Sequence, residues 1–173
     1  IGLCLVGSEM CIRDRGEGEP RIPHPDDEGW SGISLPWMAF GYGVSMTPLQ
    51  TLTFYNAVAN NGEMVKPSFI SSIGAFGEDP VYTINREVIM PSICSNETLI
   101  SVQKMLNNVV SKPWGTANNI YDKNIRIAGK TGTSQIDYTS DETQYVSSFV
   151  GYFPADNPKS VSYTHLTLPT NCV

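Results

Sequence analysis

The stretch IAGKTGTSQ, residues 127–135, combines more chemically informative residues than any other part of this 173-residue chain. Lys130 brings a positive charge, and Gly132, which has no side chain, lets another backbone lie flat against a strand. Thr131 and Thr133 offer short hydroxyl donors, and a backbone N–H just past the glycine can face a developing oxyanion. The stretch therefore holds donors suited to a carboxylate and to a developing negative charge.

Gly129, Lys130 and Thr131 also match the last three positions of the phosphate-binding loop pattern G-x-x-x-x-G-K-[ST]. The first glycine of that pattern falls at position 124, which is Asn124. A phosphate loop also opens a helix after its Lys-Thr, whereas Gly132, Thr133 and Ser134 begin a helix poorly. Both points disfavour a phosphate loop. From these residues alone, it stays open whether the Lys-Thr-Gly triplet has a function or occurs by chance.

Composition limits the class of protein. The chain is 40% hydrophobic and 16% charged, with a formal net charge of −6, as in an ordinary globular domain or a large piece of one. The acidic balance and the lack of a Lys/Arg cluster argue against a general nucleic-acid binder. No apolar run approaches the roughly 18–20 residues of a membrane span, and nothing resembles a signal peptide. Any targeting segment is expected outside this sequence.

The two ends of the chain differ from the rest. Met10–Arg15 can be encoded by ATG TGT ATA AGA GAC AG(N), and Val161–Leu166 by GTC TCT TAT ACA CAT CT(N), the reverse complement of the same DNA. Two ends of a natural protein have no reason to mirror each other, and both resemble translated transposon adaptors. We therefore expect residues 1–15 and 161–173 to be non-native and residues 16–160 to be the protein's own.

Few metal-binding side chains remain between those ends. Cys94 is the one cysteine and His24 the one histidine in residues 16–160, too few for a disulfide framework or a zinc site. Asp26, Asp27 and Glu28 are consecutive, so their carboxylates point in different directions, and a solvated loop is expected rather than a metal site. No metal or organic cofactor is predicted.

The clearest helix signals begin at Thr47. This residue is a good N-cap, Pro48 suits the first helical position, and Gln50 completes a capping box. Residues 60–62, Asn-Asn-Gly, are expected to end the helix. Its predicted apolar surface consists of Leu49, Leu52, Phe54, Tyr55, Val58 and Ala59.

A second helix is predicted over Glu97–Ser111, with Ser95 or Asn96 as its cap. The sequence Lys-Pro-Trp-Gly at residues 112–115 is expected to end it. Its predicted inward side consists of Leu99, Val102, Met105, Leu106 and Val109.

Strands are predicted on either side of this second helix. Ser68–Ile70 and Val81–Ile84, separated by the turn-rich residues 74–80, indicate two strands or a β-ribbon. Ile125–Gln135 and Tyr145–Phe153 are expected to form an antiparallel hairpin, because neighbouring strands joined by a short polar connection pair most simply in that way. The residues expected to pack inward from the second of these strands are Val146, Phe149 and Phe153.

The order of these segments is similar to that of one family. A Gly-Tyr-Gly turn precedes the Thr-Pro-Leu-Gln helix, the second helix ends near Gly-Thr-Ala at 115–117, and AGKTGT at 128–133 is followed by SFVGYF at 148–153. This order resembles the transpeptidase domain of class B penicillin-binding proteins, over about residues 30–160. The resemblance implies an α/β (α+β) fold, with an antiparallel sheet packed with helices, present here as an incomplete C-terminal part.

The resemblance also implies a reaction. In that family a serine attacks the D-Ala-D-Ala end of a peptidoglycan stem peptide, and an amine of a neighbouring stem resolves the acyl-enzyme. Lys130 would then support proton handling, while Thr131 and Thr133 would bind the terminal carboxylate. The Thr133 N–H would form half of the oxyanion hole, Gly132 would keep the strand edge open, and Gln135 would shape the cleft.

Ligands, partners and location follow from the same resemblance. It implies peptidoglycan stem peptides and β-lactams as ligands, cell-wall synthesis or division proteins as partners, and neither nucleic acid nor a cofactor. It also implies an extracytoplasmic domain in the bacterial cell envelope, with a membrane anchor in the missing N-terminal part.

The nucleophile is where the chain departs from the family. The family's S-x-N motif does not occur in this sequence, and its S-x-x-K pattern occurs once, at Ser101–Lys104. That pattern lies within the second helix rather than before the first, so both residues are expected to be solvated. The catalytic serine is expected upstream of Gly16. We also expect a cut sheet after Lys159, and therefore an isolated chain that folds poorly and is catalytically inactive.

Two further functions share the Lys-Thr-Gly strand. A serine β-lactamase or a β-lactam-sensing domain would hydrolyse or retain the acyl group instead of transferring it, although the Thr-Pro-Leu-Gln helix favours the transpeptidase by resemblance. A catalytically silent scaffold homologue would be indicated by an upstream region that lacks the serine.

Overall fold

The computed structural model describes residues 20–75, 77–135 and 145–168. These residues form two compact units. The first contains described residues 20–51 and 65–90, and the second contains residues 52–64 and the described part of 91–168. The predicted α+β class, with an antiparallel sheet packed with helices, is confirmed. No helix in the described ranges has the length and apolar character needed to cross a membrane.

The first unit begins with a loop and a short helix, α2 (Ser34–Ala39), which the sequence did not predict. The predicted capping box at the start of α3 (Pro48–Ala59) is confirmed. The Thr47 N–H donates to Gln50 Oε1 (2.8 Å), and the Gln50 N–H donates to Thr47 Oγ1 (3.2 Å). Because these two bonds are reciprocal, they satisfy two backbone donors at the helix start.

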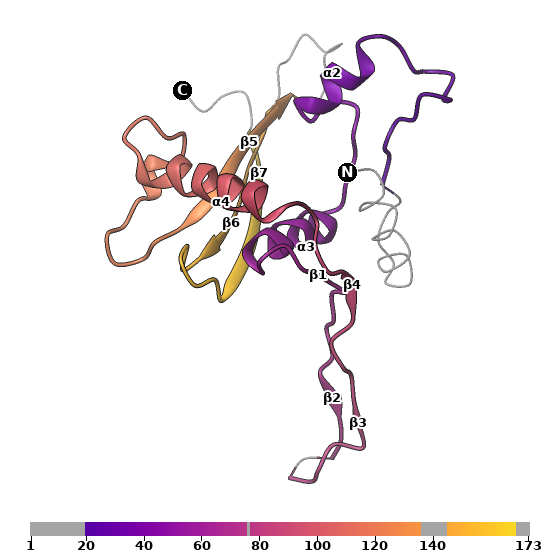
Figure 1. The fold of residues 1–173 in the computed structure, drawn as a ribbon, viewed down its shortest axis with the longest axis vertical. Helices are drawn as coiled ribbons and strands as arrows, with labels where there is room; N and C mark the ends of the chain where they lie inside the picture. Colours follow the sequence, from indigo (N-terminus) through magenta and orange to yellow (C-terminus); the bar gives the residue numbers. More distant parts are fainter. Residues whose placement is uncertain (1–19, 76, 136–144, 169–173) are drawn as a thin grey trace. The chain divides into compact units, whose positions relative to one another are not determined.

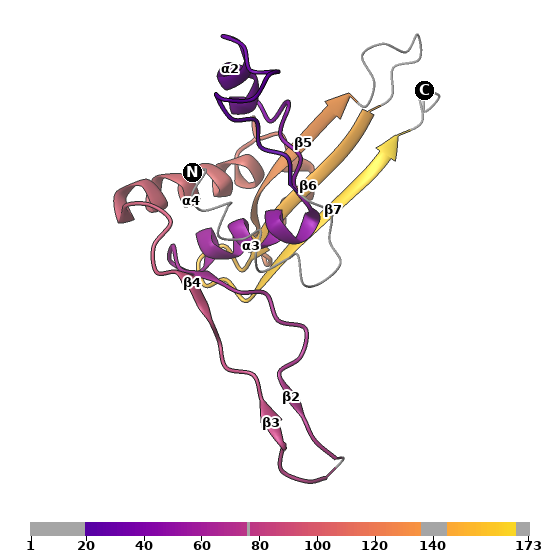
Figure 2. The same ribbon diagram turned by 90° about the vertical axis from the view of Figure 1, so that its right-hand side faces the viewer.

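The rest of the first unit is a β-ribbon. Its strands are β1 (Met64–Val65), β2 (Ser72–Ile73), β3 (Tyr82–Thr83) and β4 (Val88–Met90). β2 pairs antiparallel with β3 (Figure 2), and β1 pairs with β4. A ribbon was predicted, but the strand that pairs with β3 lies at 72–73 and not at 68–70. Both strands of the β2–β3 pair are exposed. Because neither strand has a buried face, the positions of the apolar residues do not determine which residues pair.

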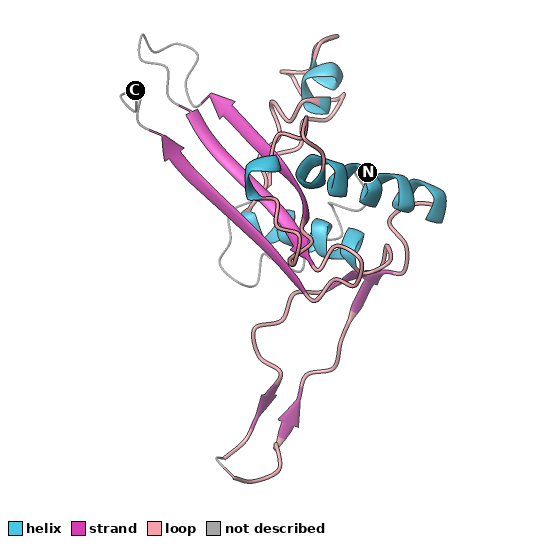
Figure 3. Cartoon of the chain, turned by 90° about the vertical axis from the view of Figure 1, so that its left-hand side faces the viewer, coloured by secondary structure: helices cyan, strands magenta, loops and turns pink. Residues whose placement is uncertain are grey.

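The second unit is built on a three-stranded antiparallel sheet of order β5-β6-β7 (Figure 3). Its strands are β5 (Ala128–Gln135), β6 (Tyr145–Phe153) and β7 (Ser160–Leu168). The predicted β5–β6 hairpin is confirmed, with Gln135 opposite Tyr145. The expectation that the sheet is cut after Lys159 is wrong, because β7 pairs with the whole of β6. Val161, Tyr163, Thr164 and Thr167 are of residue types that favour strands.

Helix α4 (Asn96–Ser111) lies across the sheet in this unit (Figure 1). Ser95 caps it, as predicted, and it packs against β5. Leu99 and Leu106 of α4 join Ala128 and Tyr152 of the sheet in one core. Val58 and Ala59, from the end of α3, complete the core. The sheet face beneath α4 is therefore the buried face.

Two residues expected to pack inward are exposed instead. Met105 is 58% exposed. The buried side of α4 consists of Leu99, Leu106 and Val110, and Met105 lies about 100° away from it around the helix axis. Phe153 is 42% exposed, because Tyr152 points inward and successive strand residues point to opposite faces. The spacing of apolar residues thus predicted α4 and β6, but it did not predict fully which of their residues face the core.

Candidate active site

Strand β5 presents the Lys-Thr-Gly residues at the edge of the sheet. Lys130, Thr131, Gly132 and Thr133 occupy consecutive positions in it, and Gln135 is its last residue. β6 is its one strand partner among the described residues, so its other long side is free of strand pairing there. An unpaired strand edge offers backbone donors and acceptors to an extended ligand.

Two glycines let β5 lie close to β6 just before the motif. Gly129 and Gly151 are directly opposite each other in the register. A Cβ on Gly129 would lie 2.5 Å from the Phe149 ring and 2.5 Å from the Val150 carbonyl oxygen. A Cβ on Gly151 would lie 2.8 Å from the same ring. The Phe149 side chain therefore fills the space beside both glycines, and this packing fixes the strand that carries the motif.

The Lys130 ammonium lies over its own strand. The side chain is exposed, and Nζ donates to the Thr131 carbonyl oxygen (2.7 Å) and lies 3.5 Å from Thr131 Oγ1. Strand alternation puts Lys130 and Gly132 on one face and Thr131 and Thr133 on the other. The long lysine side chain nevertheless reaches Thr131, so a positive charge and a hydroxyl group meet at the strand edge.

A threonine without an assigned role completes this group. Thr116 Oγ1 lies 2.8 Å from Thr131 Oγ1. The sequence showed a Gly-Thr-Ala triplet after the second helix, but no local pattern indicates that its threonine reaches a strand residue fifteen positions later. The contact depends on how the chain turns at the end of α4, which is a tertiary feature.

The one S-x-x-K pattern lies elsewhere on α4. Ser101 and Lys104 are exposed, as predicted, and Ser101 Oγ donates to the Glu97 carbonyl oxygen (2.9 Å). Ser101 lies ten residues before the end of the helix, about 15 Å along its axis. Its hydroxyl is thus engaged in a bond within the helix, away from the helix end that carries Thr116 to Thr131.

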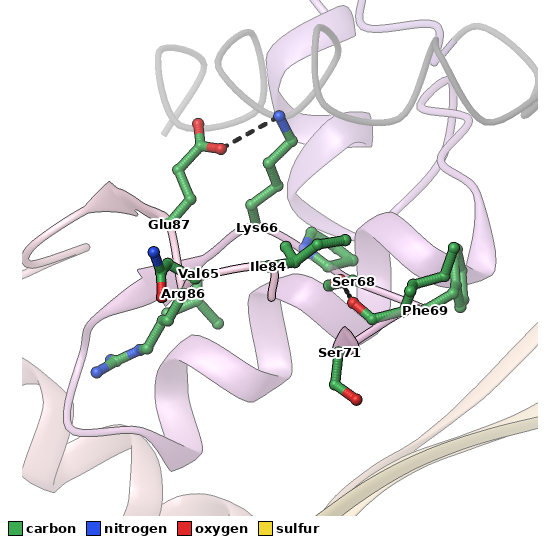
Figure 4. Close-up of a pocket in the computed structure, with 11 residues that line it drawn as sticks. Val65, Lys66, Ser68, Phe69, Ser71, Ile84, Arg86 and Glu87 are labelled. Atoms are coloured by element: carbon green, nitrogen blue, oxygen red, sulfur yellow. Dashed lines mark hydrogen bonds and ion pairs between the residues drawn. The ribbon is translucent and has the colours of Figure 1, made fainter. Parts of the chain in front are cut away.

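Other candidate sites in the described residues lie outside this group. A cavity of about 530 Å³ is bounded by ribbon residues 65–71 and 84–87, where Lys66 and Glu87 form an ion pair of 3.3 Å (Figure 4). His24 and Asp26 are exposed and 3.2 Å apart in the N-terminal loop. Within the described ranges, no cluster of three or more His, Cys, Asp or Glu side chains is arranged to hold a metal ion.

Comparison with known proteins identifies the family. Residues 14–171 match the family model for the penicillin-binding protein transpeptidase domain. The chain belongs to this transpeptidase family. The predicted resemblance to class B penicillin-binding proteins is confirmed by the relatives. The matched range includes both β5, which carries the Lys-Thr-Gly residues, and β7.

Similar relatives come from several organisms. Stage V sporulation protein D of Bacillus subtilis is 33% identical over 94% of this chain and 26% of its own length. Penicillin-binding protein PbpB of Mycolicibacterium smegmatis is 33% identical over 90% of this chain and 25% of its own. The chain thus spans about a quarter of the length of these relatives.

Solved structures match in the same way. Penicillin-binding protein 3 of Mycobacterium tuberculosis, complexed with aztreonam, gives a TM-score of 0.72 and 30% identity over 90% of this chain and 36% of that chain. Penicillin-binding protein 2B of Streptococcus pneumoniae gives a TM-score of 0.72 at 22% identity, which shows the shared fold.

Proposed function

We propose that this chain is the Lys-Thr-Gly part of a serine-type peptidoglycan D,D-transpeptidase that also binds penicillins. The observation that carries the proposal is the edge of β5 without a strand partner in the described ranges, where the Lys130 ammonium and the Thr131 hydroxyl come together. Relatives from Mesostigma viride and Buchnera aphidicola are named peptidoglycan D,D-transpeptidases. The Mycobacterium tuberculosis protein has been solved with aztreonam and with ampicillin.

The proposed reaction is acyl transfer through a serine ester. A serine oxygen attacks the carbonyl carbon of the penultimate D-Ala, and the terminal D-Ala leaves as the amine. The amine of a second stem peptide then attacks the ester and releases the serine, which forms the cross-link. The serine and its S-x-N partner are supplied by sequence of the longer protein outside residues 16–160.

The residues of β5 bind and stabilise in this scheme. A substrate backbone lies along the edge of β5 that has no strand partner among the described residues. A Cβ on Gly132 would lie 2.5 Å from Ser148 Oγ of β6, so the glycine leaves room for that side chain. Thr131 and Thr133 share a strand face, so both hydroxyl groups are available to one terminal carboxylate. The Thr133 N–H donates to the oxyanion, an interaction worth about 3–4 kcal/mol in comparable sites. Lys130 stabilises the negative charge of carboxylate and oxyanion, and Gln135 borders the cleft.

The longer protein is proposed to act in the bacterial cell envelope. Its transpeptidase domain would lie outside the cytoplasmic membrane, where the stem peptides are, and a membrane anchor would precede it. Its proposed partners are other cell-wall synthesis or division proteins. This location is supported by the relatives from Mesostigma viride and Buchnera aphidicola, whose names state that they act on peptidoglycan.

Replacing Lys130 tests the proposal. In the complete protein that contains this chain, Lys130→Ala is expected to slow acylation by a labelled penicillin about 100-fold or more, because it removes the charge beside the reacting carbonyl. The matched control is Lys104→Ala, an exposed lysine on α4, which is expected to leave the rate within about twofold. Equal rates for Lys130→Ala and wild type would contradict the proposal. Multiple turnovers of hydrolysis would indicate a β-lactamase, and no acylation of the wild type would indicate a scaffold.

A further inference from the structure

We propose that Thr116 is a positioning residue of this site, which orients the Thr131 hydroxyl toward the carboxylate of a bound stem peptide or penicillin. The inference rests on the proposed function, since that function gives Thr131 a carboxylate to bind. It assigns a role to the 2.8 Å contact between Thr116 Oγ1 and Thr131 Oγ1.

Thr116 is held in place by the chain on either side of it. On one side, a Cβ on Gly115 would collide with the Val109 carbonyl oxygen and lie 2.7 Å from that of Asn108, so glycine lets the turn approach the helix end. On the other side, the Ala117 N–H donates to the Val109 carbonyl oxygen (3.1 Å). Because both neighbours of Thr116 are fixed to α4, its hydroxyl has a defined position relative to β5.

The next residue strengthens this attachment. Asn118 Nδ2 donates to the carbonyl oxygen of Val110 (3.0 Å), a residue that is 1% exposed. Ala117 is itself buried, at 3% exposure. The turn is thus anchored by backbone, side-chain and packing interactions, whereas the Thr116 side chain remains exposed. An anchored backbone with an accessible hydroxyl is the arrangement expected of a residue that orients a neighbour.

The hydrogen-bonding capacity of Thr131 gives the direction of the effect. A threonine hydroxyl has one proton to donate and two lone pairs to accept with. The Lys130 ammonium, 3.5 Å from Thr131 Oγ1, is a donor only, so it can occupy a lone pair but cannot accept the Thr131 proton. If Thr116 also donates, both lone pairs are occupied and the Thr131 proton is free for another acceptor.

A bound carboxylate favours the arrangement in which Thr116 donates to Thr131 and the Thr131 proton is free. An ionised carboxylate accepts hydrogen bonds and donates none, so Thr131 must donate to it. Thr116 then donates to Thr131, which gives a chain from Thr116 through Thr131 to the ligand, and each bond in such a chain polarises the next. It follows that Thr116 affects ligands with a free carboxylate and has little effect on ligands without one.

The experiment compares two ligands and three variants in the complete protein. The ligands are a labelled penicillin and the methyl ester of its carboxylate, and the readout is the acylation rate constant. We expect Thr116→Val to slow acylation by the acid about five- to tenfold and by the ester less than about twofold. We expect Thr116→Ser, which keeps the hydroxyl, to stay within about twofold of wild type for both ligands.

The control variant removes a similar hydroxyl contact from the opposite end of the same helix. Thr98 Oγ1 lies 2.9 Å from Ser95 Oγ, and Thr98→Val is expected to leave both acylation rates within about twofold of wild type. Thermal unfolding separates positioning from folding, and Thr116→Ala replaces Thr116→Val if the valine variant does not fold.

The outcomes separate the two proposals. Equal losses with acid and ester, no loss with the acid, or a loss that Thr116→Ser does not restore would each overturn the role of Thr116. Failure of the wild-type protein to react with the labelled penicillin would instead overturn the proposed function.

Discussion

The two ends of helix α4 are closed in different ways. At the start, Ser95 Oγ accepts the Thr98 N–H (3.2 Å), and donor and acceptor are three residues apart. At the finish, residues 115–118 turn back onto the last carbonyl oxygens of the helix and hold Thr116 against Thr131. The first end is a local cap, whereas the second end is part of the proposed site. Changes at the first end should therefore affect stability alone, and changes at the second should affect stability and acylation together.

The largest effect is expected at the second end, from Gly115→Ala. The added Cβ would collide with the Val109 carbonyl oxygen, so the turn or the helix end must move. We expect a loss of about 2–3 kcal/mol in the free energy of unfolding and a fall of tenfold or more in penicillin acylation of the complete protein. Denaturant unfolding and acylation kinetics measure both quantities.

A glycine in open space gives the control for that change. A Cβ on Gly32 would meet nothing within 4 Å, so Gly32→Ala is expected to change the free energy of unfolding by less than about 0.5 kcal/mol. If Gly115→Ala were as mild as Gly32→Ala, the turn would not be held against α4 as described.

An intermediate effect is expected at the first end, from Ser95→Ala. This change removes the side-chain acceptor for the Thr98 N–H and should cost about 1 kcal/mol of stability. Acylation by penicillin should stay within about twofold of wild type, because this cap is far from the proposed site. A loss of acylation comparable to that of Gly115→Ala would remove the distinction between the two ends.

The smallest effect is expected beneath the middle of α4, from Tyr152→Phe. Tyr152 is 1% exposed, and its hydroxyl has no hydrogen-bond partner among the described residues. Its removal should change stability by less than about 0.5 kcal/mol at neutral pH and leave acylation unchanged. A loss above about 1 kcal/mol would show that the hydroxyl has a partner.

The same tyrosine gives a pH dependence. Burial raises the pKa of Tyr152 above its ordinary value of 10.0, because it disfavours the charged phenolate. The stability linked to this group is present below pH 10 and is lost as the pH rises above it, since the unfolded chain ionises first. Tyr152→Phe should therefore unfold less readily than wild type above pH 10, as measured by chemical denaturation across that range.

Local signals predicted the elements that depend on neighbouring residues. The capping box of α3 and the Ser95 cap of α4 involve partners within four positions. The end of α3 was predicted in the same way. Asn61 and Gly62 have φ of 53° and 86°, and the Gly62 N–H donates to the Ala57 carbonyl oxygen (2.8 Å), as in a Schellman cap. The bounds of β6 were predicted because Tyr, Val and Phe, which favour strands, fill most of its positions.

Features set by distant packing were not predicted. The contact between Thr116 and Thr131 joins the end of a helix to a strand, and no residue period specifies it. The exposure of Met105 depends on which side of α4 faces the sheet. Strand β7 was not predicted, because residues 161–168 resemble translated adaptor sequence. Pairing with β6 shows that their pattern suits a strand, and the adaptor origin stays a prediction that sequencing the native locus across both junctions would test.

The central claim is that β5 serves a serine that another part of the longer protein supplies. The most direct measurement is to acylate the complete protein with a labelled penicillin, digest it, and locate the label by mass spectrometry. We expect one labelled serine, in an S-x-x-K sequence upstream of Gly16, and strong loss of the label in Lys130→Ala. A label on Ser101 would contradict the account, because that hydroxyl bonds to the Glu97 carbonyl oxygen within α4, about 15 Å along the axis from the helix end at the site.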